Sequence, residues 1–258
     1  GVDVNCNPGV PVKNEAKHTT RYKWQQPVRI DRDKVFNARQ VKCRRMLSGA
    51  AYRKVHRAGL TTGALYGTEV APITDSQLAR MRSAAVRAEG IWSAGTPTCV
   101  YWLAIGPRAD PAFIAFSKPI LRVAREIWLL SPIVEGHRCH PDRLTAIELN
   151  RLCHCISNDS NTSLLLSWMH KCFAKFGITA PNPATWTIGQ RTSDVPFSTK
   201  ALILDSLAEV WASINQAEVC TKLEVPPFDG SIIRKEYARA SFSHRRLLVQ
   251  LIGNTVYT

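Results

Sequence analysis

Apolar residues recur with helical spacing along most of the chain, and this pattern predicts a mainly α-helical protein. The clearest case is a predicted helix over about 33–57, capped by Asp31 or Asp33. At 100° per residue, this helix has an apolar face and a cationic flank. The face carries Phe36, Cys43, Leu47 and Ala50, and the flank carries Arg39, Lys42, Arg53 and Arg57. One side of the helix therefore packs, and the other is expected to meet an anionic partner.

The stretch after the basic helix is expected to anchor it to the rest of the protein. Gly59 and Gly63 interrupt the helical pattern, and a compact apolar segment follows them. Within that segment we interpret Tyr66 as a ring that fills the core. Gly67 is interpreted as a glycine that allows close backbone approach.

The remaining pattern predicts further helices, roughly seven or eight in all. They cover about 75–90, 110–130 with a break or kink at Pro119, 141–156, 161–177, 198–218 and a basic stretch after Pro226-Pro227. Arg80, Arg82 and Arg87 are expected to face mostly outward, and the helix over 161–177 is expected to be central to the core. The other segments are interpreted as a short strand leading into an irregular basic arm (1–34), a linker with apolar anchors (91–109) and a loop (178–197).

Composition and charge indicate a folded chain with an anionic partner. Of the 258 residues, 45% are apolar and 21% charged, which argues against disorder. Residues 1–60 hold 14 Lys or Arg against 4 Asp or Glu, so +10 of the net charge of +14 lies there. This asymmetry is typical of a protein that binds a polyphosphate, above all nucleic acid. The alternative is a basic surface that only aids solubility.

The basic arm also interleaves aromatic and cationic side chains. Tyr22 and Trp24 alternate with Arg21 and Lys23. Such rings stack on bases or sugars while the cations hold phosphate. The equally weighted alternative is that the two rings pack the arm onto the body.

The sequence predicts a soluble intracellular protein, nuclear or cytoplasmic, without a membrane partner. Its apolar runs fall short of the roughly 20 residues that cross a bilayer, and no signal pattern opens the chain. Eight cysteines without the density of a secreted scaffold favour reduced thiols. Because the chain begins at Gly1, we expect it to be a segment of a longer polypeptide.

Local motifs favour no catalytic chemistry. Two-metal phosphoryl transfer needs closely placed carboxylates, and the nearest pair, Asp31 and Asp33, lies among cations that compete with Mg²⁺. Nucleotide-loop and nucleophile-elbow fingerprints are missing, and no local signal favours a Cys or Ser nucleophile with a His partner. A cluster offers zinc-type ligands at His137, Cys139, His140, Cys153, His154, Cys155, His170 and Cys172. Because Cys153 and Cys155 diverge by about 200° on one predicted helix, buried thiols are the preferred interpretation.

Four short motifs in order resemble the segment that follows the catalytic palm of non-long-terminal-repeat (LINE-type) retrotransposon reverse transcriptases. They are the strand end Gly1-Val2-Asp3, the basic segment Phe36–Arg57, the run Ala64-Leu-Tyr-Gly-Thr-Glu-Val70 and the helix Gln77-Leu-Ala-Arg-Met-Arg82. The resemblance covers residues 1–92 and fades from about residue 93. It implies two units: palm-end strand, arm and thumb-like helices over 1–92, and a helical downstream region over 93–258.

The resemblance implies a thumb-like helical bundle that grips primer and template behind the active site. The family's catalytic aspartates lie upstream of Gly1, so no catalytic residue, metal or other cofactor is expected in this chain, and Mg²⁺ would be held by upstream residues. The implied partners are the backbone of an RNA or DNA duplex and the upstream palm and fingers, without a small-molecule substrate.

Cations along a packed helix suit sequence-independent contact with phosphates. The predicted phosphate contacts are Arg39, Lys42, Arg45, Arg53, Lys54 and Arg57, with Arg21, Lys23 and Arg29 on the arm. Two alternatives share most of these observations: a stand-alone helical nucleic-acid-binding protein, and a module whose basic end binds an acidic protein surface.

Overall fold

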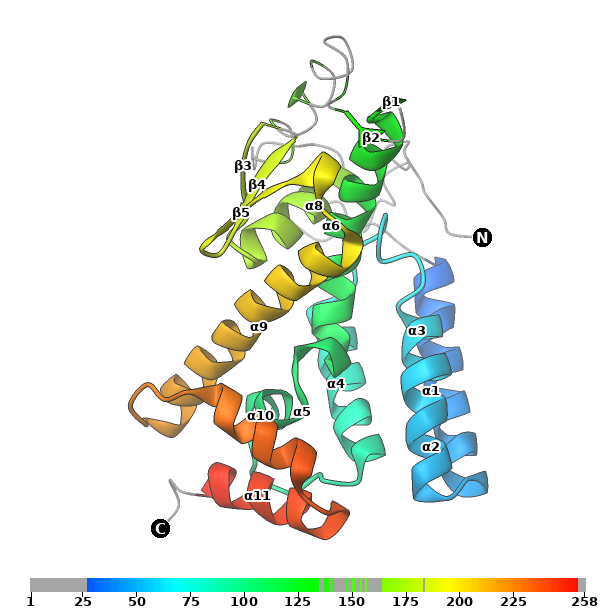
Figure 1. The fold of residues 1–258 in the computed structure, drawn as a ribbon. Coiled ribbons are helices and arrows are strands. Elements are labelled where there is room, and N and C mark those ends of the chain that lie inside the picture. Colours follow the sequence, from blue (N-terminus) through cyan, green and yellow to red (C-terminus); the bar gives the residue numbers. More distant parts are fainter. Residues whose placement is uncertain are drawn as a thin grey trace, which may run out of the picture.

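The computed structural model describes residues 27–134, 137–139, 141, 147, 150–151, 154, 156, 164–182 and 184–254. It confirms a mainly helical protein, with a small antiparallel sheet at one end (Figure 1). The strand and arm expected before residue 27 lie outside the described residues. So does most of the helix expected over 141–156.

The predicted basic helix is in fact a helical hairpin. Helix α1 (Pro27–Met46) ends before a turn at Leu47-Ser48, and α2 (Gly49–Val55) returns beside it, continuing through the π-helical turn η1 (His56–Leu60) into α3 (Thr61–Ala64). The prediction of one helix over 33–57 is therefore wrong, because Ser48 adopts an extended conformation at ψ 156° and reverses the chain. We call residues 27–64 the basic hairpin.

The structure also bears on the expectations for the glycines and the helix cap. Gly59 and Gly63 lie within η1 and α3 rather than ending the helix, and the chain leaves the helical path at Leu65. Gly67 then adopts φ 82°, a left-handed conformation that favours glycine in this turn. The expected cap at Asp31 or Asp33 is wrong, because α1 begins at Pro27 and both residues lie within it.

Helix α4 (Asp75–Glu89) follows the sequence prediction closely. The Thr74 hydroxyl accepts a hydrogen bond from the Gln77 backbone N–H, and the Gln77 side chain accepts one from the Thr74 N–H, which forms a capping box. Gly90 ends the helix at φ 74°. The predicted inward residues Leu78, Met81 and Val86 are buried.

The expected linker over 91–109 contains a buried helix, α5 (Thr98–Ile105), and the short turn η2 (Pro107–Ala109). Tyr101, Trp102 and Leu103 are almost completely buried, because α5 packs against α9, α10 and α11. A helix covered on all sides has no polar face, so its sequence shows no amphipathic period. For this reason, the short apolar sequence between Gly and Pro residues was interpreted as a linker.

The remaining helices surround two apolar cores. Helix α6 (Pro111–Leu130) passes through Pro119 without a break, and α8 (Leu164–Lys175) buries Trp168, Cys172 and Phe173 as predicted. Helix α9 (Lys200–Leu223) leads to two helices where one basic helix was expected, α10 (Gly230–Arg239) and α11 (Phe242–Asn254).

The larger core extends from the basic hairpin to α9. It includes Phe36 of α1, Trp168 of α8 and Trp211 of α9. Residues from both sides of position 92 contribute, so the units expected at 1–92 and 93–258 share this core. The smaller core is built around α5.

The expected loop over 178–197 is a three-stranded antiparallel sheet followed by the turn η3 (Val195–Phe197). Strands β3 (Thr179–Asn182), β4 (Thr185–Ile188) and β5 (Arg191–Asp194) lie in that order, and a separate pair joins β1 (Ile133–Val134) to β2 (His137–Arg138). On β4, Trp186 and Ile188 are buried between more exposed threonines. Pro181 suggested a loop, but β3 is an edge strand, where proline is tolerated.

A buried carboxylate connects three of these helices. Asp110, the N-cap of α6, accepts hydrogen bonds from Arg82 of α4, from the Ala112 backbone N–H and from Trp211 Nε1 of α9 at 2.9–3.1 Å. Asp110 is fully buried and Arg82 is mostly buried, so the expectation that Arg82 faces outward is wrong. The four donor groups fix α4, α6 and α9 relative to one another.

Replacing Asp110 should therefore cost far more stability than replacing a surface carboxylate. We expect Asp110→Ala to lower the free energy of unfolding by about 3–5 kcal/mol, because it leaves the Arg82 charge buried without a partner. The matched control is Asp205→Ala, which removes an exposed pair with Arg108 and should cost less than about 1 kcal/mol. Chemical denaturation measures both, and equal losses would contradict this role.

Candidate nucleic-acid interface

Four of the predicted phosphate contacts lie exposed on the basic hairpin. Arg39, Lys42 and Arg45 follow one another at three-residue intervals on α1, and Lys54 lies on α2. Phe36 of the same helix is buried in the core. Within the described part of the chain, none of these four cations forms an ion pair with a carboxylate. Their charges therefore face solvent.

The other predicted contacts differ in position or partner. Arg21 and Lys23 lie outside the described residues; Arg29 is on α1, but its side chain is not described. Arg53 and Arg57 both turn toward Glu89 at the end of α4: Arg57 Nε donates to Oε1 at 2.6 Å, and Arg53 Nε lies 3.7 Å from Oε2. These two arginines therefore hold the hairpin against α4.

The Glu89 carboxylate is well placed to anchor both arginines. Its side chain is only 7% exposed, whereas that of Arg57 is 50% exposed. A buried carboxylate needs a paired cation, and a negative charge in the last turn of a helix opposes the helix dipole. Both arginines relieve these costs, and the outer part of the Arg57 side chain remains accessible.

Overall the basic hairpin combines high charge with a fixed position. Residues 27–64 hold ten Lys or Arg against two Asp, a net charge of +8. One of the two, Asp33, pairs with Arg80 of α4 at 2.6 Å, so it adds a second link to the body. The turn of the hairpin and α11 lie at the same end of the molecule, opposite the β3–β5 sheet (Figure 1).

A buried histidine joins the two arms of the hairpin. His56 in η1 makes edge contacts with Phe36 of α1 and Tyr52 of α2, at ring distances of 5.9 and 5.7 Å. Its Nδ1 is 3.2 Å from the Thr61 hydroxyl. Burial, with a smaller effect of Arg57, lowers the pKa of His56 from 6.5 to about 4. The ring is therefore neutral at pH 7 and packs as part of the core.

Tyr66 does not fill the core as expected, because the neighbouring Leu65 occupies that position. Leu65 is fully buried, whereas Tyr66 is 56% exposed. The Arg32 guanidinium lies 4.7 Å from the Tyr66 ring centroid and donates to the Tyr66 carbonyl at 2.6 Å. Lys118 of α6 donates to the Leu65 carbonyl at 2.8 Å. These contacts hold the start of α1 against the turn after α3.

The group of His and Cys residues with zinc-type ligands, for which buried thiols were the preferred interpretation, is only partly described. Cys172 is buried, and burial raises the pKa of its thiol, consistent with a thiol that packs in the core. His170 Nδ1 donates to the Ile156 carbonyl at 2.6 Å. His140, Cys153 and Cys155 lie outside the described residues. Among the residues that are described, no three metal-binding side chains come together.

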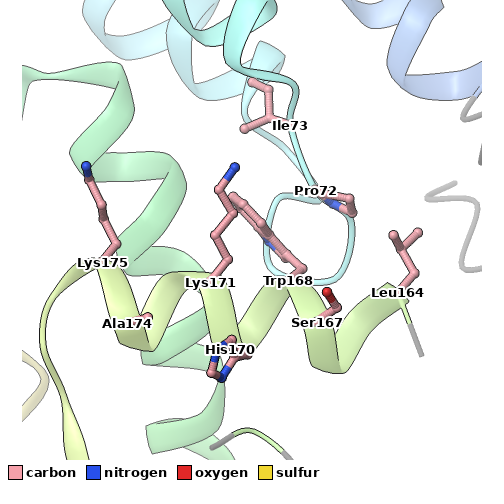
Figure 2. A pocket seen from close by; sticks show the side chains of 9 residues that line it. All are labelled: Pro72, Ile73, Leu164, Ser167, Trp168, His170, Lys171, Ala174 and Lys175. Atoms are coloured by element: carbon pink, nitrogen blue, oxygen red, sulfur yellow. The ribbon is translucent and has the colours of Figure 1, made fainter. Parts of the chain in front are cut away.

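A shallow hollow lies between α8 and the segment before α4 (Figure 2). Its volume is about 560 Å³, and its lining includes Pro72, Ile73 and Trp168, with Lys171 and Lys175 on the same helix. Lys171 pairs with Asp75 at 3.3 Å. None of the predicted phosphate contacts lines it, so the hollow is separate from the candidate interface.

Comparison with protein-family models, curated proteins and solved structures finds no match to this chain. Within the described residues, no helix has the length and apolar character needed to cross a membrane.

The pKa of His56 predicts that acid weakens the hairpin. Since the folded pKa of about 4 lies below the ordinary 6.5, the unfolded chain binds the proton more readily. The stabilisation is complete above about pH 6.5 and is lost as the pH falls toward 4, by up to roughly 3 kcal/mol.

The measurement is the free energy of unfolding against pH for the wild type and His56→Phe. Phenylalanine keeps a ring between Phe36 and Tyr52 but cannot titrate. The difference between the two proteins should change across this pH window; a constant difference would show that His56 does not titrate as described.

Proposed function

We propose that the basic hairpin binds the sugar-phosphate backbone of an RNA or DNA duplex. We further propose that the chain is the primer-template-gripping segment of a reverse-transcriptase-like retroelement polyprotein, with catalysis supplied by upstream palm and fingers. The observation that carries the binding proposal is the exposed set Arg39, Lys42, Arg45 and Lys54, which has no carboxylate partners in the described part of the chain. The wider identity rests on the motif order in the sequence.

The position of the cations supports phosphate contact in particular. A duplex backbone presents closely spaced negative charges, and neutralising them releases condensed counterions. Lysine and arginine side chains on a helix that is fixed to a body lose less freedom on binding than those on a free segment. Contacts of this kind position a duplex without reading its sequence, as a polymerase thumb must do.

The test is salt-dependent binding of duplex RNA, DNA and RNA–DNA hybrid. Each phosphate contact contributes about 0.7–0.9 to the slope of log affinity against log salt. The double variant Lys42→Glu, Arg45→Glu should therefore flatten the slope by roughly 1.4–1.8, because two contacts are lost. Fluorescence anisotropy at several salt concentrations measures it.

The matched control places the same charge change elsewhere. Arg125 on α6 and Lys200 on α9 are exposed, and both lie outside the hairpin. Arg125→Glu, Lys200→Glu should leave the slope nearly unchanged. If the two double variants flatten the slope equally, binding depends only on net charge. If neither variant changes the slope, the hairpin is not the binding site.

A further inference from the structure

The loop after α4 holds an exposed tryptophan on a firmly tied backbone. Trp92 is 46% exposed. The next residue, Ser93, is fixed through both backbone groups: its N–H donates to the Tyr101 hydroxyl at 2.7 Å, and that hydroxyl donates to its carbonyl at 3.0 Å. Gln250 of α11 also donates to the Ser93 hydroxyl at 3.3 Å. Trp92 is therefore presented to solvent from a backbone that the core restrains.

A second exposed aromatic side chain reaches the same turn from the end of the sequence. Phe242, the first residue of α11, is 53% exposed. Its ring packs on Gly90: a Cβ atom added to this glycine would lie 2.8 Å from the ring atom Cζ. Gly90 is two residues before Trp92, so Phe242 packs on the turn that leads to Trp92. We call these two side chains the aromatic pair.

Each ring of the aromatic pair carries an arginine. The Arg87 guanidinium lies 5.5 Å from the centroid of Trp92, and the Arg53 guanidinium lies 5.0 Å from that of Phe242. Arg53 belongs to the basic hairpin, so Phe242 contacts the element that carries the proposed phosphate contacts. Arg246 is exposed one helical turn after Phe242 on α11 and adds another cation.

Exposed rings that alternate with arginines suit unpaired nucleotides better than a duplex. Every base has a π face that stacks on an aromatic ring, but in a duplex both faces are already stacked. Guanidinium groups beside the rings attract phosphates and stack on bases as well. Single exposed aromatic side chains are common on protein surfaces, so the inference depends on two rings that each lie beside an arginine, not on exposure alone.

We propose that the aromatic pair, with Arg87 and Arg53, binds a single-stranded stretch that extends from the duplex held by the hairpin. The interface then recognises a junction between paired and unpaired nucleic acid. This inference rests on the proposed function in one respect: the single strand extends from the duplex that the hairpin is proposed to bind. The two rings of the stacking site, Trp92 and Phe242, are not among the predicted phosphate contacts.

The test compares a blunt duplex with the same duplex carrying an overhang of about six nucleotides. We expect the wild type to bind the overhang form about tenfold more tightly. Trp92→Ala and Phe242→Leu should each remove most of this preference while leaving blunt-duplex affinity within about twofold. Phe242→Leu keeps an apolar side chain against Gly90, so it preserves packing.

Phe197→Leu is the matched control, because Phe197 is equally exposed but lies in η3 next to the sheet. It should keep the overhang preference, and thermal unfolding confirms that each variant is folded. No overhang preference in the wild type, or an undiminished preference in both aromatic variants, overturns this inference.

The same assay separates this inference from the proposed function. One outcome is that Lys42→Glu, Arg45→Glu loses blunt-duplex binding while the aromatic variants keep the overhang preference. This outcome supports the proposed function and overturns the stacking site. If those charge reversals change nothing while Trp92→Ala still weakens binding of the overhang form, the stacking site stands and the duplex proposal falls.

Discussion

The joint between the basic hairpin and the rest of the protein depends on one buried carboxylate that two arginines share. Glu89 lies in the last turn of α4, where the helix dipole and the loss of water both disfavour a negative charge. Arg53 and Arg57 offset that cost from a different helical segment, so α4 and the hairpin stabilise each other's charges. The same contact sets Arg53 over Phe242, which brings α11 to the joint. A single acidic residue thus connects the hairpin, α4 and the C-terminal helix.

This arrangement divides the cations of the protein into two groups. Arg57, Arg80 and Arg82 each meet a carboxylate on another element and serve the fold. Arg39 and Lys42 meet none in the described part of the chain. Net charge alone treats all five alike, whereas their partners distinguish those that hold helices together from those that remain for a ligand. Glu89, Asp33 and Asp110 are used where helices meet, whereas the exposed cations Arg39 and Lys42 of α1 keep their positive charge.

Sequence reasoning succeeded where an element carries its own local signals. The capping box of Thr74 and the left-handed Gly90 mark the ends of α4 without any tertiary information. It failed where tertiary packing decides. Helix α5 is apolar on every side because other helices cover it, and β4 alternates over only four residues. The reversal at Ser48 did carry a local signal, the Ser48-Gly49 dipeptide, but the helical period on both sides of it outweighed that signal.

The candidate site shows the same division. Helical spacing predicts the exposed cations on α1. Glu89, Trp92 and Phe242 lie far from α1 in the sequence, so spacing within α1 does not predict their positions. One signal for Glu89 was present: an acidic residue beside a helix-ending glycine opposes the dipole and so predicts a cationic partner.

Repulsion between the cations of α1 also destabilises the helix. Arg39, Lys42 and Arg45 repeat at three-residue intervals, and like charges at this spacing destabilise a helix by a few tenths of a kcal/mol per pair. Asp33, the acidic residue with a described side chain on α1, is already paired with Arg80. The repulsion therefore persists in the free protein, and the packing of Phe36 and His56 holds the arm in place against it. A polyanion that lies along this flank would remove the repulsion as it binds, so the charge pattern that weakens the isolated helix favours the complex.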